Sequence, residues 1–486
     1  MRNVYHRLSF LAIALSAFFM SEALDLPVKT VDGHEVFYYK VGKKETVYGI
    51  AKHLGITPEE IVRHNPDAAD GIKRGMMLYF PFEEYAAIDS SVGRELAEDT
   101  VADADSIYAS NDTVIVKDPS IALLLPFGLS SEEPTRGNKL ALDFYKGFLL
   151  GADTLAERSG TIKILAFDTE AKDTDLSAIL ARQEVADAAV IVAPNDKDAL
   201  ETIATNAAER GTRVLNVFLV HDSLYLTNPM MLQANIPQRQ MYKLAADAFL
   251  SDYAGYTPLI LRNTTGKNEK EGFVSYLTER MREKGIEPQM IEYDGNLLAS
   301  SFESLPVSNG ERYVVVPSSG TLAEFNKFAY TLKSFRDRLT MVDTEAEDYD
   351  PLKPLAKLAV FGYPDWTAFR GDALDMLHKL EAAVYSRFFD DFAGFASRTL
   401  ENDFKYWYGE GFIESVPSQA ILGYDTARFL IKNIRANGGA FDPVFPLVFE
   451  GIQSTFEFEK TGEGYCNSTL YILNYRPDGR IDERTI

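Results

Sequence analysis

The chain has 486 residues, with 49 Lys and Arg against 72 Asp and Glu, which gives a formal net charge of −23 at pH 7. A negative surplus of this size disfavours binding to nucleic acid or to an anionic membrane surface, because both require clustered basic residues. The single cysteine, Cys466, excludes an internal disulfide and a cysteine-rich zinc or iron–sulfur site. At roughly 150 residues per domain, the length indicates about three folded units, or one small module and a large two-lobed one.

The first 23 residues have the three-part layout of a secretory signal peptide. Arg2 and Arg7 precede an apolar run over residues 8–20, and Ser21-Glu22-Ala23 provides a small-x-small cleavage site. An uncleaved membrane anchor is the alternative, but the run is 13 residues long, and a spanning helix needs roughly 20. We therefore expect export to the periplasm, cleavage after Ala23, and no membrane span afterwards.

Three segments follow before the main body of the chain. Residues 24–37 are interpreted as a lead-in, and residues 38–82 as a compact module. Residues 83–118 contain ten acidic and two basic residues, with many Ala and Ser. A segment of this composition cannot bury a core, so the sequence predicts an acidic flexible linker.

The compact module has the residue pattern of a β-α-α-β unit. The sequence predicts strands at 38–41 and 77–80. Thr46 is suited to cap a first helix, and Thr57 followed by Pro58 is suited to begin a second one.

This module resembles a LysM module over its whole length. The resemblance rests on Glu45-Thr-Val-Tyr-Gly-Ile-Ala51, Ile56-Thr-Pro-Glu-Glu-Ile61, Asn65-Pro66 and the closing Phe80-Pro81. It implies binding of N-acetylglucosamine-containing glycan, meaning peptidoglycan or chitin, and the arrangement is similar to that of Bacteroidetes-type envelope proteins. The implied glycan-binding residues are Lys44, Glu45, Thr46, Val47, Tyr48, Asp67, Gly71 and Ile72.

Two features of the module bear on glycan binding. Lys44-Glu45-Thr46 stands where the family usually has Gly-Asp-Thr, so the close glycine approach to the glycan is missing. Thr46 also has a purely structural interpretation as a helix cap. For Asn65 we favour a role in closing the turn, and for the aliphatic side chains of the helices we favour a place in the core: Ile50, Ala51, Leu54 and Ile61.

Beyond residue 119, apolar runs alternate with helical patterns. The run Ile121–Leu125 is continuously apolar, as in a strand buried on both faces. Further strands are predicted at 161–167, 189–192, 213–218, 258–262, 289–293, 312–316 and 357–361. Helices are predicted at 138–158, 176–186, 198–210, 238–253, 270–284 and 321–335. This alternation predicts an α/β fold with doubly wound parallel sheets, and its length favours two lobes.

The same region resembles type I periplasmic binding proteins, especially the leucine/isoleucine/valine-binding group. The resemblance covers about 119–486 and rests on short segments: Ile121–Phe127, Phe144–Ala152, Ala189–Asn195, Tyr313–Gly320, Phe361–Trp366 and Ala420–Asp425. It implies a first lobe over about 119–236 and 390–445, and a second lobe over about 237–389 and 446–486. It also implies a cleft with these candidate lining residues: Phe127, Pro194, Asn195, Asp196, Asn216, Phe218, Thr264, Ser318, Ser319, Tyr363, Asp365 and Trp366.

An amino-acid ligand suits this cleft poorly. Where the family's receptors grip a carboxylate through backbone N–H groups, this chain has Pro194-Asn195-Asp196; proline has no N–H, and Asp196 would repel a carboxylate. Asp365 and Trp366 offer a site for an ammonium group, although for Trp366 we favour a place in the core.

Catalytic patterns are missing from the sequence. The six histidines show no metal-ligand spacing, and the adjacent residues His221, Asp222 and Ser223 do not make a triad, which depends on geometry. We therefore expect no enzyme activity, no cofactor and no metal. The expected function is that of an envelope protein anchored to peptidoglycan whose large domain binds a partner protein or a small solute, with a role in cell-wall synthesis. A solute receptor of an ABC importer, and a cell-wall hydrolase or hydrolase activator, stay open as alternatives.

Overall fold

The computed structural model describes most of the chain beyond residue 118 and parts of the N-terminal region. The described residues are 28–31, 34–41, 46–47, 50–51, 58–65, 68, 72–73, 76–81, 119–155, 161–171, 175–220, 223–341, 349–350, 352–391, 394–444 and 448–486. The expected signal peptide and acidic linker lie outside these residues. Contacts divide the chain into a small unit within residues 1–109 and a large unit that carries nearly all of residues 110–486.

The small unit contains an antiparallel sheet in the order β1-β2-β3, with β1 at Val28–Val31, β2 at His34–Lys40 and β3 at Met77–Pro81. The expectation of a separate lead-in over 24–37 is therefore wrong, because β1 and the first half of β2 belong to the sheet. Val31 pairs with His34, and the two residues between them in the sequence are Asp32 and Gly33. An Asp-Gly pair between two strands is a strong hairpin signal.

The core of the small unit follows the sequence prediction. Residue 47 and residues 50–51 are helical, and helix α2 spans Pro58–His64. The buried apolar side chains are Phe37, Val41, Ile50, Ala51, Ile61, Ala68, Leu78 and Phe80. The Asn65 side chain donates to the Tyr79 carbonyl oxygen (3.0 Å) and accepts from the Tyr79 N–H (2.7 Å). The structural interpretations of Ile50, Ala51, Ile61 and Asn65 are thus confirmed, while Leu54 lies outside the described residues.

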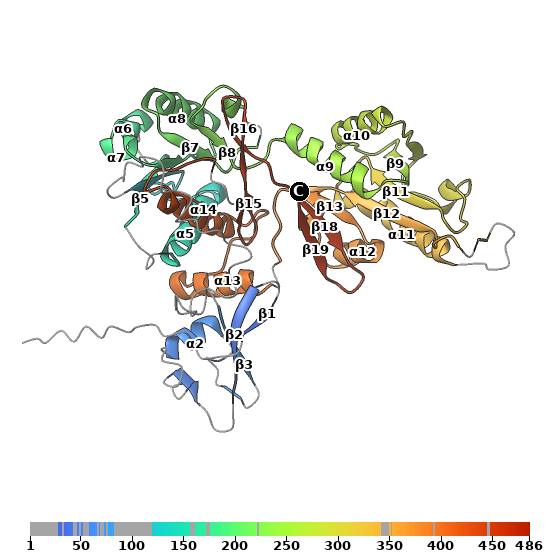
Figure 1. Ribbon diagram of the computed structural model, residues 1–486, viewed down its shortest axis with the longest axis horizontal. Helices are drawn as coiled ribbons and strands as arrows, with labels where there is room; N and C mark the ends of the chain where they lie inside the picture. Colours follow the sequence, from blue (N-terminus) through green and yellow to red (C-terminus); the bar gives the residue numbers. More distant parts are fainter. Residues whose placement is uncertain are drawn as a thin grey trace, which may run out of the picture. The chain divides into compact units, whose positions relative to one another are not determined.

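The first lobe of the large unit is built on a seven-stranded sheet (Figure 1). All neighbouring strands are parallel except the β16–β17 hairpin. From edge to edge, its strands are β16 (Phe458–Thr461), β17 (Gly464–Asn467), β8 (Met231–Gln233), β7 (Arg213–Asn216), β6 (Val190–Val192), β4 (Ser120–Leu125) and β5 (Lys163–Asp168). Its helices are α5 (Arg136–Asp153), α6 (Leu176–Leu180), α7 (Gln183–Ala186), α8 (Lys197–Arg210), η3 (Leu224–Leu226), α13 (Phe395–Tyr408) and α14 (Gln419–Ala436).

Helices cover both faces of this sheet, which explains the continuous apolar run in β4. Ile121, Leu123 and Leu125 join one core with α5 and α14, whereas Ala122 and Leu124 join another with α6, α7 and α8. The single helix expected at 176–186 is wrong, because α6 ends at Leu180 and Arg182 adopts an extended conformation before α7.

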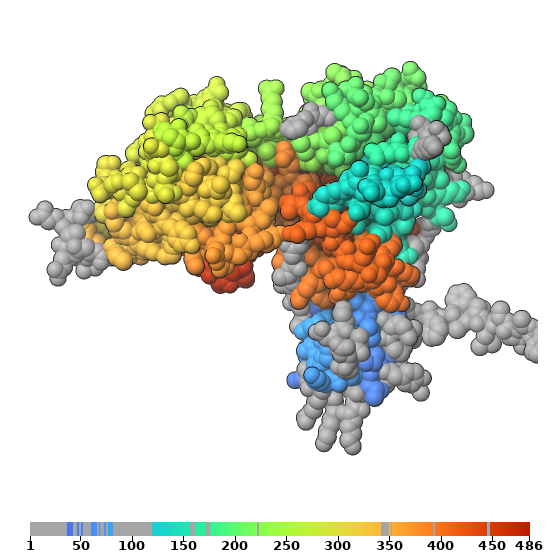
Figure 2. Space-filling model, turned by 180° about the vertical axis from the view of Figure 1, so that it is seen from behind, coloured from blue at the N-terminus to red at the C-terminus, as the bar shows by residue number. Residues whose placement is uncertain are grey.

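Glycines bring α5 and α14 into close contact. A Cβ atom placed at Gly147 would lie 1.8 Å from the Ala420 carbonyl oxygen, and one at Gly423 would lie 2.0 Å from the Phe144 carbonyl oxygen. The segments 144–152 and 420–425, which carried part of the family resemblance, therefore pack directly on each other. In Figure 2, the residues around α5 and α13 likewise lie side by side although they are far apart in the sequence; the Ile413 N–H after α13 donates to the Asp143 carboxylate of α5 (2.7 Å).

The second lobe is built on another seven-stranded sheet, in which β18 and β19 are antiparallel additions to a parallel set. Its strands are β10 (Gln289–Tyr293), β9 (Thr257–Asn263), β11 (Arg312–Pro317), β12 (Lys357–Gly362), β13 (Ala383–Ser386), β18 (Tyr471–Tyr475) and β19 (Ile481–Thr485). Its helices are α9 (Gln238–Asp252), α10 (Glu271–Glu283), η4 (Ala299–Phe302), α11 (Leu322–Thr340), η5 (Pro364–Ala368) and α12 (Asp372–Leu380).

The last passage between the lobes comes later than expected. The assignment of residues 446–486 to the second lobe is wrong for its first half, because β17 pairs with β8 of the first sheet. A short hairpin of β14 (Phe449–Glu450) and β15 (Thr455–Phe456) precedes it. The chain therefore passes between the sheets at three places: between β8 and α9, between β13 and α13, and between β17 and β18. Within the described ranges, no helix combines the length and apolar character needed to cross a membrane.

Candidate functional site

Strands β4 to β8 of the first sheet run parallel, so their carboxyl ends meet at one edge. In open α/β sheets, ligands bind outside this edge. Half of the expected cleft residues lie at or just after these strands: Phe127, Pro194, Asn195, Asp196, Asn216 and Phe218. These residues thus lie along one edge of the sheet, and their contacts show what each side chain does.

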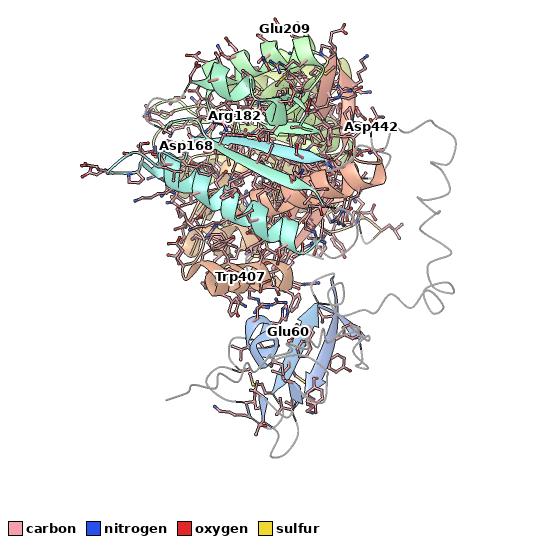
Figure 3. All side chains as sticks on the ribbon, turned by 90° about the vertical axis from the view of Figure 1, so that its left-hand side faces the viewer. Glu60, Asp168, Arg182, Glu209, Trp407 and Asp442 are labelled. Carbon is pink, nitrogen blue, oxygen red and sulfur yellow. The ribbon has the colours of Figure 1, made fainter. Side chains whose placement is uncertain are left out.

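The loop after β4 is held by a carboxylate of the chain itself. Asp168, labelled in Figure 3 at the end of β5, accepts from the Gly128 N–H (3.0 Å) and the Leu129 N–H (2.8 Å). It also accepts from the Glu170 N–H at 3.0 Å. Two backbone donors that suit an anionic ligand are thus already occupied.

The polar groups of the turn after β6 likewise bond within the chain. Pro194 is buried, and Asp196 accepts from the Ala199 N–H (2.7 Å) as the N-cap of α8. Asn195 is exposed beside it. This geometry agrees with the expectation that the turn does not bind a carboxylate, since its carboxyl group already serves the helix.

Asn216 is fully buried and serves the sheet. Its amide donates to the Gln233 Oε1 atom (2.8 Å) and to the Leu219 carbonyl oxygen (3.0 Å), which joins the ends of β7 and β8. The rings of Phe218 and Phe144 meet edge-on at 5.0 Å, and those of Phe127 and Tyr145 at 5.3 Å. Phe127 and Phe218, the two candidate cleft residues, are half-buried.

The second lobe repeats the arrangement of a loop filled by a protein carboxylate. Ser318, Ser319 and Gly320 follow β11 and precede α11. Glu269 accepts from the Gly320 N–H (2.6 Å) and from the Ser319 hydroxyl group (3.0 Å), while the Ser318 hydroxyl group donates to Asn268 (2.5 Å). The donors that a ligand carboxylate would use in this turn are therefore occupied by Glu269.

Asp365 and Trp366 do not form an ammonium site. Trp366 is completely buried; its indole N–H donates to the Gly320 carbonyl oxygen (3.1 Å), and its ring packs on Phe325 and Phe369. Asp365 already pairs with the Lys270 ammonium group at 2.6 Å. The core interpretation of Trp366 is confirmed, and the partner of the Asp365 carboxylate in this structure is the Lys270 ammonium group.

The two remaining candidates at this edge are also tied to the protein. Tyr363 is fully buried, donates its hydroxyl group to the Pro317 carbonyl oxygen, and burial raises the pKa of its phenol well above the ordinary value. Thr264 is exposed, and its hydroxyl group donates to the Tyr293 carbonyl oxygen at 3.2 Å.

The candidate glycan-binding residues are described only in part. Thr46 is exposed and its carbonyl oxygen accepts from the Ile50 N–H at 2.9 Å. Val47 and Ile72 are half-buried, and both pack against the core of the small unit. The other five candidates, Lys44, Glu45, Tyr48, Asp67 and Gly71, lie outside the described residues.

The three passages between the lobes form a hinge that sequence reasoning missed. The Arg387 Nε–H after β13 donates to the Ile236 carbonyl oxygen before α9 (2.7 Å). Asn467, at the end of β17, donates to the carbonyl oxygens of Ala234 (3.1 Å) and Thr455 (2.9 Å). Side chains of the second and third passages therefore bond to the backbone of the first. No local pattern marks these residues, since the contacts join segments far apart in the sequence.

Asp425 of α14 organises the loop beside the hinge. Its buried carboxylate accepts from the N–H groups of Ile452 (2.8 Å), Gln453 (3.0 Å) and Ser454 (3.0 Å). Burial raises the pKa of Asp425 to about 7, although these three N–H groups and the charge of Arg428 oppose the shift. Desolvation thus has the larger effect on this carboxyl group.

The large unit shares its fold with proteins of known structure. No protein-family description and no curated protein matches this chain. A putative branched-chain amino acid ABC transporter protein from Rhodospirillum rubrum has a similar structure, with a TM-score of 0.50, 13% identity, and coverage of 76% of this chain and 100% of that chain. The large unit has a type I periplasmic binding fold. The predicted fold class is thereby confirmed.

Two further solved structures match with lower TM-scores. An ABC transporter substrate-binding protein from Desulfitobacterium hafniense in complex with Leu has a TM-score of 0.42 at 13% identity, and the match covers 76% of this chain and 100% of that chain. Full-length LpoA from Haemophilus influenzae has a TM-score of 0.44 at 16% identity, and the match covers 77% of this chain and 60% of that chain.

The reactive side chains noted in the sequence show no catalytic arrangement among the described residues. His221 and Asp222 lie outside those residues. Cys466 is buried, and burial raises the pKa of its thiol to about 12, so its reactive thiolate form is disfavoured. Among the described residues, no group of three His, Cys, Asp or Glu side chains is arranged to hold a metal ion.

Proposed function

We propose that this chain is a non-catalytic protein of the cell envelope that is held on peptidoglycan by its small unit. In this proposal the signal peptide directs export, and the type I unit binds a partner protein. The partner acts at the cell wall, and the protein regulates wall synthesis through it.

The glycan part of the proposal is supported by the small unit. The order β2, helical residues 47 and 50–51, α2 and β3 follows the β-α-α-β order that accompanies the LysM-like residues. Val47 and Ile72 each pack on the core yet keep part of their surface exposed. Partly exposed aliphatic groups beside backbone donors suit a sugar, which has apolar ring faces and an acetamido group.

The choice of a protein over a small solute is carried by one observation in the type I unit. Backbone N–H groups at the strand ends of both lobes already donate to carboxylates of the chain. The Gly128 and Leu129 N–H groups donate to Asp168, and the Gly320 N–H donates to Glu269. An amino acid would have to displace these carboxylates. A partner protein has no such requirement, since it binds outer surfaces.

Binding to purified sacculi tests the glycan part. We expect the mature protein to sediment with sacculi, and a version without residues 24–82 to stay in the supernatant. Ile72→Ala should weaken sedimentation, whereas Met76→Ala should not. Met76 is the matched control because it is also half-buried against the same core but lies outside the candidate groove. Equal sedimentation of both variants, with unchanged thermal unfolding, would contradict the groove assignment.

Two further readouts test the type I unit. Crosslinking in intact cells, followed by mass spectrometry, should recover a wall-synthesis enzyme with the full-length protein. A thermal-shift panel of amino acids should leave the melting temperature unchanged; a saturable shift would favour the receptor of an importer. Release of soluble muropeptides from sacculi by the purified protein would instead show that it is a hydrolase.

A further inference from the structure

The hinge of the type I unit encloses a small pocket. Its empty volume is about 200 Å³, including the open side, which is below the roughly 300 Å³ at which pockets for drug-sized ligands begin. The lining contains one cationic residue and no acidic residue, in a chain with a net charge of −23. The lining residues are Ala234, Asn235, Ile236, Arg387, Phe388, Ser454, Thr455, Phe456 and Asn467.

Two polar side-chain atoms of this lining have no hydrogen-bond partner within the described ranges of the chain. Ser454 is 2% exposed and its hydroxyl oxygen forms no hydrogen bond; Asn235 is 8% exposed and the same holds for its Oδ1 atom. An unpartnered polar group at this depth costs about 1–3 kcal/mol, so such groups usually have a ligand or water. Either end of the Asn235 amide can face the pocket, because the orientation of an amide is assigned from its surroundings.

The cation of the pocket is also unpaired. Arg387 is half-buried, and its one side-chain hydrogen bond among the described residues is the Nε–H donation to the Ile236 carbonyl oxygen. Within the part of the chain that the structure describes, no carboxylate pairs with its guanidinium group, and burial lowers the pKa of Arg387. A desolvated cation without a counter-charge is costly, and an anion at its free N–H groups removes that cost.

We propose that this pocket binds a small inorganic anion of the size of chloride, held by the Arg387 guanidinium group, the Ser454 hydroxyl group and the Asn235 amide. The anion goes beyond the proposed function, since it is neither the glycan nor the partner. The lining includes residues of all three passages: 234–236 of the first, 387–388 of the second and Asn467 of the third. A bound anion therefore stabilises the hinge.

Thermal unfolding of the mature protein tests the site. We compare sodium chloride with sodium gluconate, whose anion is too large for the pocket, at equal ionic strength. Chloride should raise the melting temperature by several degrees and in a saturable way, because ligand binding to the folded state stabilises it. The gain should be lost in Ser454→Ala and in Arg387→Gln.

Arg213→Gln is the matched control. Arg213 also donates to a backbone carbonyl oxygen, that of Pro229 (2.6 Å), and its guanidinium group lies over the Tyr465 ring, but it is outside the pocket. This variant should respond to chloride like the unchanged protein.

Direct detection gives a second readout that does not depend on stability. Chloride-35 NMR lines should broaden with the mature protein and not with Ser454→Ala, and crystals grown in bromide should show an anomalous peak beside Arg387. Equal chloride responses in all variants, together with the absence of a bromide peak, would overturn the proposal and show that the unpartnered groups bind water.

Discussion

The strand-end loops and the hinge pocket differ in how their polar groups are partnered. At the strand ends, Asp168 and Glu269 satisfy the loop donors from within the chain. At the hinge, the buried Ser454 hydroxyl group and Asn235 Oδ1 atom have no partner in the part of the chain that the structure describes, and they lie beside Arg387, which has no carboxylate partner there. The backbone donors of these two loops are thus met by the protein's own carboxylates, whereas two unpartnered polar atoms lie together where the chain passes between the lobes.

The largest expected effect concerns Trp366, which lies at the strand ends of the second lobe, and tests whether this side chain belongs to the core. Trp366→Ala should lower the free energy of unfolding by about 3–5 kcal/mol, because it empties a fully buried site. Trp407→Ala is the control, since Trp407 is 58% exposed and packs edge-on against Tyr406; it should change stability by about 0.5 kcal/mol or less. Urea unfolding measures both, and similar losses would show that Trp366 is not a core residue.

The second prediction concerns the loop beside the hinge. Asp425→Asn should cost about 2 kcal/mol at pH 5, because the amide NH₂ group cannot accept from the N–H groups of residues 452–454. Asp442→Asn should cost far less, since the exposed Asp442 carboxylate accepts from a single N–H group among the described residues, that of Val444. Equilibrium unfolding of the two variants under one set of conditions gives the comparison.

The stability of Asp425→Asn relative to the unchanged protein should depend on pH, with a defined sign. The pKa of Asp425 is about 7 in the folded protein and about 3.9 in an unfolded chain. The folded state therefore binds the additional proton, and this contribution to stability is complete below pH 4 and lost as pH rises through 7. The stability difference between the unchanged protein and Asp425→Asn should shrink over that range. A widening difference would mean that the three N–H groups outweigh burial.

The third prediction opens a strand-end loop. Glu269→Ala should cost about 1–2 kcal/mol, because it leaves the Gly320 N–H and the Ser319 hydroxyl group without their acceptor. Acetate should recover part of the lost melting temperature by replacing the carboxylate. Glu271→Ala removes a nearby carboxylate that pairs with Arg262 and should not respond to acetate. An equal acetate effect on the unchanged protein would show that Glu269 does not fill the loop.

Local signals explain what the sequence could predict. The buried strand β4 follows from a continuous apolar run. Helices α8 and α11 follow from residues at their ends: Asp196 and Thr321 cap the N-termini, and Gly211 ends α8 at φ = 77°. Each of these features depends on neighbours in the sequence. The α/β class and the two sheets followed from their alternation.

Long-range pairing explains what was missed. Strands β8 and β17 pair through Leu232 and Tyr465, and their shortness leaves no periodic pattern, so residues 446–467 were placed in the wrong lobe. The carboxylates that fill the loops, Asp168 and Glu269, are two among 72 acidic residues. Nothing local distinguishes them, because their role depends on which loop the fold brings beside them.

The smallest expected effect concerns the ion pair at the second strand-end edge. Asp365→Asn removes the partner of Lys270, but the Asp365 side chain is 45% exposed, so solvent screens the pair and the loss should be about 1 kcal/mol or less. Lys270 also lies over the Tyr363 ring, 5.5 Å from its centre, and this contact remains in the variant. If the edge is closed, neither lysine nor leucine added in solution should shift the melting temperature of Asp365→Asn or of the unchanged protein. A shift that disappears in Asp365→Asn would show that Asp365 exchanges Lys270 for a ligand ammonium group, and the strand-end edge would then be the ligand site instead of a closed surface.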